Sequence, residues 1–304
     1  MRPLIPEFIY RQFEQDNLHG TMQAYAMFFD LSGFTSMTEE LMKQGNEGAE
    51  ALSVLLNGIF EPMVRLVYGE GGIIPHFAGD SFVAIFPQSV TDPRRVFDTA
   101  CRILDLYRKE DHRQTPFGSF RIDLKIGVSL GQVEWGIVGF AMRRAFYFRG
   151  EAIDECARCQ VLADKEDMVA DAALHSLWKS VGIFGFEIRP GYYAYHFEHP
   201  VTDFSGIGRP MPNPQQSVLQ HFFPQEVLEF DRGGEFRTVT ALFLSFMGVE
   251  DHDAMEKLAT VILEAVNGFS GYFKEIDFGD KGGVMVAFFG APISFERITN
   301  RTLE

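Results

Sequence analysis

Two aspartates stand where a divalent cation could bind. Asp30 follows the apolar residues 25–29, which predict a strand, and Asp80 lies between two apolar segments that predict a hairpin. A lone Gly-Asp usually belongs to a turn. A strand ending in Asp beside a hairpin tip carrying Asp, however, brings two carboxylates together, and these repel unless a cation lies between them. The pair therefore predicts a divalent metal site.

The segment after Asp30 adds a candidate phosphate-binding element. Leu31, Ser32, Gly33, Phe34 and Thr35 lead into a predicted helix. Backbone N–H groups at a helix start hold phosphate without any side-chain charge. Such help is needed here because 27 Lys+Arg stand against 42 Asp+Glu, a net charge of −15.

Three stretches together resemble a known family. Residues 28–35 (FFDLSGFT) and 77–86 (FAGDSFVAIF) are similar to the two metal motifs of class III adenylyl/guanylyl cyclase domains. Residues 150–158 (GEAIDECAR) are similar to the third motif, in which a glycine is followed by an asparagine and then an arginine at four-residue intervals. Within the family, the chain most resembles the tandem, soluble, bicarbonate-responsive adenylyl cyclases.

The resemblance implies intramolecular phosphoryl transfer, in which the ribose 3′-OH of ATP (or GTP) attacks the α-phosphate and releases pyrophosphate. It implies two Mg²⁺ or Mn²⁺ ions bridged by Asp30 and Asp80, with the Leu31 carbonyl as a further ligand. The amides of Gly33, Phe34 and Thr35 would hold phosphates. Arg158 would stabilise charge on the α-phosphate in the transition state.

The sequence departs from the family at the residues that recognise the nucleoside. Asp154 stands where active halves have the ribose-orienting Asn, Tyr147 where a residue reads the purine, and His76 where a Lys reads adenine. Ser245 of a second copy aligns with Asp30. These complementary losses imply a pseudo-heterodimer with one competent site, and a second pocket where His76 and Arg158 would hold a small regulatory anion.

The elements that would position these residues occur twice along the chain. The first set is a strand at 24–29, a helix at 38–68 and a hairpin at 73–77 and 82–86. The second set is a strand at 238–246, a helix at 253–268 and a hairpin at 272–289 around Gly279 and Asp280. Such a repeat predicts two homologous units.

Only the first unit continues, with a strand at 121–130, its hairpin partner at 132–139 and a helix at 152–164. We therefore expect an α+β fold with a ferredoxin-like or palm-like βαββαβ sheet, as one complete cyclase domain and a truncated second copy. The expected boundaries are 1–198 for the first domain, 199–234 for a Pro-rich linker and 235–304 for the second, degenerate domain. The chain alone should have weak cyclase activity or none, because the nucleoside-reading part of the second copy would follow Glu304.

The composition argues against some classes of partner and indicates a cellular compartment. The acidic balance argues against nucleic acid, which requires a basic surface, and no apolar run reaches the length that spans a bilayer. The odd count of 3 Cys favours a reducing, cytoplasmic compartment. Cys156 and Cys159 form a single C-x-x-C on a predicted helix, which indicates packing rather than a zinc or redox site.

Two alternatives remain open on these residues. Residues 78–82 (AGDSF) are one glycine and one acid short of the diguanylate cyclase signature, although the motif ending at Arg158 counts against that class. The chain could also be a catalytically degenerate cyclase-homology module that binds nucleotide or a partner, as Tyr147, Asp154 and Ser245 suggest.

Overall fold

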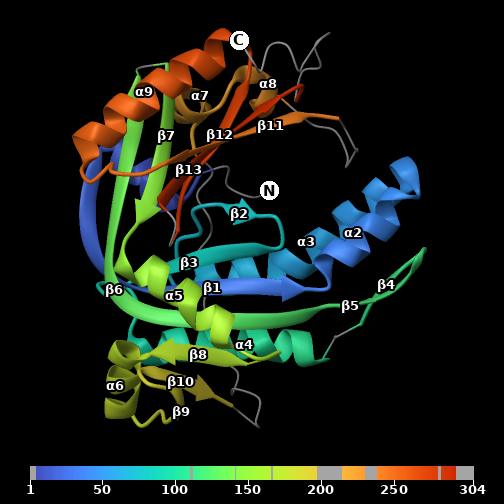
Figure 1. The fold of residues 1–304 in the computed structure, drawn as a ribbon, viewed down its shortest axis with the longest axis vertical. Coiled ribbons are helices and arrows are strands. Elements are labelled where there is room, and N and C mark those ends of the chain that lie inside the picture. Colours follow the sequence, from blue (N-terminus) through green and yellow to red (C-terminus); the bar gives the residue numbers. More distant parts are fainter. Residues whose placement is uncertain are drawn as a thin grey trace.

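The computed structural model describes residues 5–109, 112–140, 142–165, 167–196, 214–229, 238–279 and 282–291. Within these residues the first unit is built on one large, strongly twisted sheet (Figure 1). Its strands follow the order β2-β3-β1-β6-β8-β10-β9, and β7 also pairs with β6. Their bounds are β1 His19–Ser32, β2 Phe77–Ala78, β3 Ser81–Pro87, β6 Asp123–Phe140, β7 Arg143–Arg149, β8 Met168–Asp171, β9 Phe186–Arg189 and β10 Tyr192–Tyr195.

Alternating side chains of β1 and β6 build two cores on opposite faces of this sheet. Tyr25, Met27 and Phe29 of β1 face one core, which is closed by α3 and α4. Ala24 and Ala26 face the other core, which includes buried residues of α1, α5 and α7. The helices are α1 Glu7–Glu14, α2 Phe34–Met42, α3 Gly45–Gly69, α4 Pro93–Lys109, α5 Glu151–Leu162, α6 Ala172–Ser180, α7 Gln216–Phe222 and α8 Gln225–Leu228.

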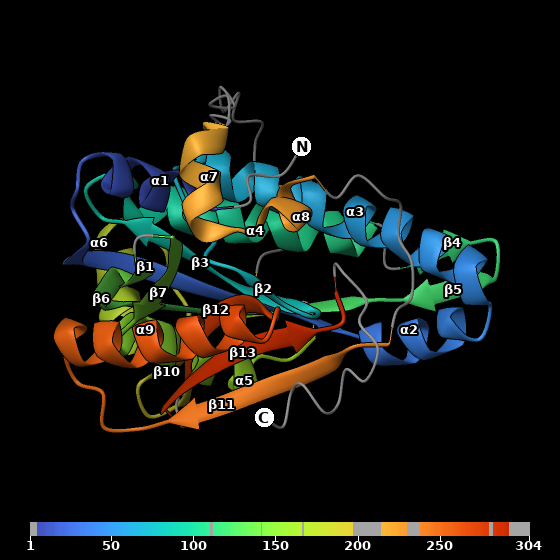
Figure 2. The ribbon, with the colours of Figure 1, turned by 90° about the horizontal axis from the view of Figure 1, so that it is seen from above.

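The second unit repeats the strand–helix–hairpin order of the first and packs against it. Its described elements are β11 Thr240–Phe246, α9 His252–Gly268, β12 Tyr272–Gly279 and β13 Gly282–Phe289. The sheet order is β11-β13-β12, and α9 and β12 lie along the β6–β7 hairpin (Figure 2). Val138, Ala145 and Tyr147 of the first unit share one buried core with Met255 and Leu263 of the second. The two units therefore form a continuous interface.

These elements confirm the expected α+β fold, and they correct two details. The expected helix at 38–68 is two helices, α2 and α3, because the chain turns at Gly45, whose φ of +60° favours glycine. The expected hairpin at 121–139 is one continuous strand, β6. Gly131 makes no turn there; a Cβ at this position would lie 3.2 Å from the Ala152 nitrogen, so it allows α5 to approach the strand. The hairpin partner of β6 is β7.

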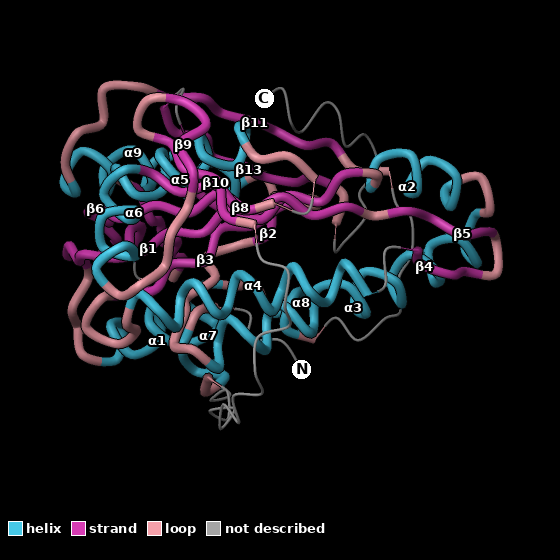
Figure 3. The backbone as a smooth tube through the Cα atoms, turned by 90° about the horizontal axis from the view of Figure 1, so that it is seen from below, coloured by secondary structure: helices cyan, strands magenta, loops and turns pink. Residues whose placement is uncertain are grey.

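Two further features lie at the periphery of the first unit. The strands β4 His112–Thr115 and β5 Gly118–Arg121 form a separate hairpin, which projects beside α2 and α3 (Figure 3). Helix α3 has the length and apolar composition of a membrane-spanning helix, contrary to the sequence expectation, although core helices meet the same criterion. Its Ile59, Met63 and Val67 are buried in the core.

Candidate active site

Asp30 on β1 and Asp80 in the turn before the neighbouring strand β3 lie at one end of the sheet. Asp30 lies near the C-terminal end of β1 and is paired in register with Ser81 of β3. The Leu31 amide donates a hydrogen bond to the Asp80 carbonyl (3.3 Å) across the same two strands. Asp80 occupies the turn between β2 and β3, as expected, whereas Asp30 lies within β1 and is not a turn residue. The sequence prediction that the two carboxylates approach one another agrees with this register.

The electrostatics of Asp30 report that proximity. Burial raises the pKa of Asp30, and the negative charge of Asp80 raises this pKa further. Lys125, its cross-strand partner on β6, acts in the opposite direction, as does a hydrogen bond from Gln160. A cation that binds between two neighbouring carboxylates removes their repulsion and stabilises the ionised form of both. The oxygen donors at this end of the sheet therefore fit a divalent ion.

Gln160 is a site residue that the sequence did not reveal. It lies on α5, and its side-chain amide Nε2 donates to Oδ2 of Asp30 over 2.8 Å. The two residues are 130 positions apart, and no spacing pattern connects an amide with a carboxylate at that separation.

The segment after Asp30 presents amides at a helix start. Gly33 precedes α2 in the left-handed conformation with φ of +93°, and a Cβ there would lie 2.4 Å from the Arg121 carbonyl oxygen. Only glycine fits this position. No side chain caps the N-terminus of α2, and Thr35 is exposed. The first amides of α2 are thus oriented as an anion-binding helix start requires.

With this geometry in place, comparison with known proteins identifies the family. The profile described as Adenylate and Guanylate cyclase catalytic domain matches residues 19–187, more than half of the chain. The chain belongs to this family. Asp30, Asp80 and Arg158 all lie inside the matched residues.

Curated relatives are adenylate cyclases. Adenylate cyclase type 10 of Homo sapiens is 24% identical over 88% of this chain, and that of Oryctolagus cuniculus is 29% identical over 88%. The chain spans about a fifth of the length of these two relatives (19%). Adenylate cyclase of Anabaena cylindrica is 29% identical over 47% of this chain and 28% of its own length.

Two solved cyclase structures are similar to part of this chain. The adenylyl cyclase CyaB from P. aeruginosa gives a TM-score of 0.46 at 21% identity, covering 60% of this chain and 98% of its own. A bacterial light-regulated adenylyl cyclase gives 0.49 at 18% identity, covering 67% of this chain and 61% of its own.

Gln160 faces Asp30 from one side of α5, and Arg158 and Asp154 of this cyclase domain lie on other sides of the same helix. Arg158 precedes Gln160 by two positions, so it points away from Asp30. Its guanidinium is half exposed and pairs with Glu155. Asp154 lines a pocket between the two units together with Glu134, Arg149, Gly248 and Gly282. The structure therefore brings Asp154 to the interface between the units and does not bring Arg158 to its own unit's aspartates.

Arg149 holds the second unit at this pocket. Its guanidinium pairs with Glu134 (2.7 Å) and donates to the carbonyls of Val249 (2.7 Å) and Glu250 (2.5 Å). It also lies over the rings of Tyr147 and Phe278. Val249 and Glu250 follow β11, the first strand of the second unit, so a cation binds backbone carbonyls at this strand end. Sequence reasoning missed this contact because Arg149 belongs to none of the three motifs.

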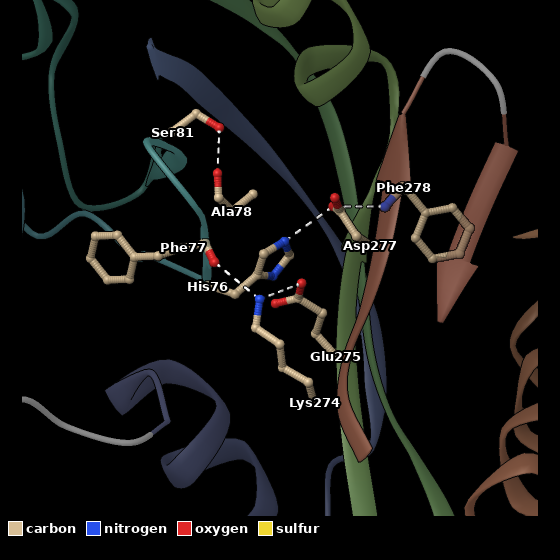
Figure 4. Close-up of polar contacts among 8 residues, drawn as sticks. All are labelled: His76, Phe77, Ala78, Ser81, Lys274, Glu275, Asp277 and Phe278. Atoms are coloured by element: carbon tan, nitrogen blue, oxygen red, sulfur yellow. Dashed lines mark hydrogen bonds and ion pairs between the residues drawn. The ribbon is translucent and has the colours of Figure 1, made fainter. Parts of the chain in front are cut away.

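His76 connects the two units at a second point, shown in Figure 4. Its Nε2 lies 3.1 Å from Oδ1 of Asp277 on β12. Beside it, Nζ of Lys274 donates to Glu275 (2.8 Å) and to the Phe77 carbonyl (3.3 Å). Burial lowers the pKa of His76, but Asp277 and Glu275 outweigh burial and leave this pKa raised. Both cations of the predicted anion pocket, His76 and Arg158, thus already contact carboxylates.

The remaining sequence candidates are the three cysteines and the second-unit hairpin at Asp280. Cys101, Cys156 and Cys159 are buried free thiols, and burial raises the pKa of each, which keeps the thiols protonated. The described ranges contain no group of three or more His, Cys, Asp or Glu side chains arranged to hold a metal ion. Asp280 and Lys281 lie outside the described residues, as does the Pro-rich segment 197–213.

Proposed function

We propose that the chain is the catalytic part of a nucleotidyl cyclase that converts ATP to cyclic AMP and pyrophosphate in signal transduction. The observation that carries this proposal is the approach of Asp30 on β1 to Asp80 in the adjoining β2–β3 turn, next to the uncapped helix start at Gly33. The adenylate cyclase relatives favour ATP over GTP. We also propose a cytoplasmic location, on the odd count of 3 Cys.

Asp30 and Asp80 would hold two Mg²⁺ or Mn²⁺ ions, with the Leu31 carbonyl as a further ligand. The hard oxygen donors and the raised pKa of Asp30 support this assignment. Bound ions of this kind would acidify the attacking 3′-hydroxyl and neutralise charge on the leaving pyrophosphate. The protein's part is to hold the two carboxylates in place at this end of the sheet.

The amides of Gly33, Phe34 and Thr35 would bind the phosphates, and the left-handed Gly33 supports this role by keeping the helix start open. Arg158 would stabilise the transition-state charge at a site shared between units, which accords with its outward direction on α5. Asp154 would face the ribose position of such a shared site.

The second unit would complete a pseudo-heterodimer with the first. The shared core of Val138 and Leu263 supports this arrangement. The domain boundaries we propose are 1–198 and 235–304, joined by 199–234. A small anion bound by His76 and Arg158 would have to displace Asp277 and Glu155 from them.

The test uses the full chain with Mn²⁺ and ATP. We expect Mn²⁺-dependent ATP binding by calorimetry and at most a trace of cyclic AMP by chromatography, because the second unit supplies few nucleoside contacts. Asp30→Asn and Asp80→Asn should each abolish both signals. Undiminished Mn²⁺-dependent binding in either variant would refute the two-metal assignment.

One observation favours a second candidate, a degenerate cyclase-homology module that binds nucleotide without turnover. Arg149 binds the carbonyls of Val249 and Glu250 in the pocket where a second nucleotide would lie. Binding of ATP with no cyclic product, in a chain extended beyond Glu304 as well as in this one, would select that candidate.

A further inference from the structure

Gln160 occupies a place from which it can control the orientation of Asp30. Its Nε2 donates to Oδ2 of Asp30 over 2.8 Å, within the half-buried space between α5 and the sheet. Lys125 flanks Asp30 on the same face of the sheet through the strand register, and Asp80 lies on the other side of β1, in the turn before β3. Gln160 is the neutral donor in this arrangement.

The fold fixes Gln160 through a close approach of α5 to β6. A Cβ at Gly127 would lie 2.0 Å from the Cys156 carbonyl oxygen and 2.2 Å from the Gln160 nitrogen, so glycine is required for the contact. Two residues along the strand, Ser129 donates to the Ala152 carbonyl (2.5 Å). The backbone of Gln160 is therefore positioned by β6, the strand that also carries Lys125.

A single donor on one carboxylate oxygen has a defined physical effect. It restricts rotation of the carboxylate, and it stabilises the ionised form, because charge-assisted hydrogen bonds are stronger than neutral ones. It also does this without adding positive charge, which would repel a cation. Partners of this kind orient metal-binding carboxylates in other proteins.

We propose that Gln160 is a positioning residue that orients the Asp30 carboxylate for divalent cation binding. This inference rests on the proposed metal site at Asp30 and Asp80. Loss of such an outer partner typically weakens metal affinity about 10- to 100-fold.

The experiment measures Mn²⁺ affinity of the full chain by electron paramagnetic resonance of the free ion, without nucleotide. Gln160→Met keeps the length of the side chain and removes the donor. We expect about a tenfold weaker Mn²⁺ affinity, a loss larger than any drop in the unfolding temperature in EDTA accounts for. The matched control is Gln23→Met, at an exposed position of β1, which should bind Mn²⁺ as the parent chain does.

Asp30→Asn separates failure of this inference from failure of the proposed function. If Asp30→Asn weakens Mn²⁺ binding and Gln160→Met does not, the positioning role is wrong and the metal site stands. If Asp30→Asn binds Mn²⁺ as the parent chain does, the metal site itself is wrong and the inference falls with it. A drop in the metal-free unfolding temperature of Gln160→Met that matches its loss of affinity would reduce Gln160 to a structural residue.

Discussion

Asp30 is placed where its charge opposes folding. Burial and the charge of Asp80 both raise its pKa, so ionisation is less favourable in the folded chain than in the unfolded one. This destabilisation is present above the folded pKa and disappears as the pH falls through it. A residue kept for metal binding commonly lowers stability in this way.

From this follows a prediction for Asp30→Asn in metal-free protein. At neutral pH the variant should unfold at a higher temperature than the parent chain, with a free energy of unfolding greater by about 1 kcal/mol. Addition of Mn²⁺ should stabilise the parent and leave the variant unchanged. Asp164→Asn, at an exposed position, is the control and should stay within about 0.5 kcal/mol. Equal stabilisation of both chains by Mn²⁺ would contradict the prediction.

Among the helices and strands, the contact of α5 with β6 places Gln160 beside Asp30. Both glycines of β6 that face the helix, Gly127 and Gly131, permit backbone approach. Replacement of Gly127 by Ala should force α5 outward and cost about 1–3 kcal/mol of stability, as overpacking does. Thermal and urea unfolding measure this loss. Mn²⁺ affinity should fall in parallel because Gln160 moves with the helix.

Gly58→Ala gives the matched control for that change. Gly58 lies in the exposed part of α3 with nothing within 4 Å of a Cβ. Alanine at a helix interior should stabilise the chain by about 0.5–1 kcal/mol. Two Gly→Ala changes of opposite sign would show that contact with α5, and not the loss of glycine, determines the outcome; a shared sign would count against the proposed fit.

The same elements show what sequence reasoning can reach. The pairing of Asp30 with the Asp80 hairpin followed from strand ends and turn residues, which are local signals. The continuity of β6 through Gly131 did not, since a glycine that makes room for a helix looks the same in sequence as one that makes a turn. Gln160 and Arg149 were missed for a related reason: their partners, Asp30 and the Val249 carbonyl, are set by tertiary packing.

At the scale of the whole molecule, the two units meet through a buried core and several polar contacts, which include those of Arg149, of His76 with Asp277, and of Glu256 with the Gly139 amide. The pair of His76 and Asp277 should make their association depend on pH. The raised pKa of His76 means that its stabilisation is present below its unfolded pKa and is lost as the pH rises through the folded value. Burial would raise the pKa of Asp277, but His76 outweighs burial and lowers it, so this contribution is lost only in acid.

We therefore expect the unfolding temperatures of the parent and His76→Asn to differ most between about pH 5 and 6 and to converge toward pH 8. Lys274 and Glu275 also face His76, so Asp277→Asn should be measured alongside. The double variant should lose no more than either single one. A difference that stays constant from pH 5 to 8 would assign the contact a packing role only.

Arg149 should anchor the second unit by its two carbonyl contacts and its ring contacts. Arg149→Ala should destabilise the chain by about 2 kcal/mol or more, because the carbonyls of Val249 and Glu250 lose a charged donor. Limited proteolysis should then release the second unit earlier. Arg65→Ala, which removes an exposed pair with Glu61, should cost no more than about 1 kcal/mol. Identical digestion of the two variants would argue against the anchor.

The unbroken length of β6 has a consequence for how this chain can vary over evolution. Even-numbered residues such as Ile126 and Val128 face the first core, odd-numbered ones such as Val133 and Ile137 face the second, and Val138 faces the other unit. Insertion or deletion of one residue between them would turn every later side chain to the opposite face. The core contacts of Val133 and Ile137 and the contact of Val138 with the second unit would be lost together. Related chains should therefore differ in length at their loops and keep this strand residue for residue.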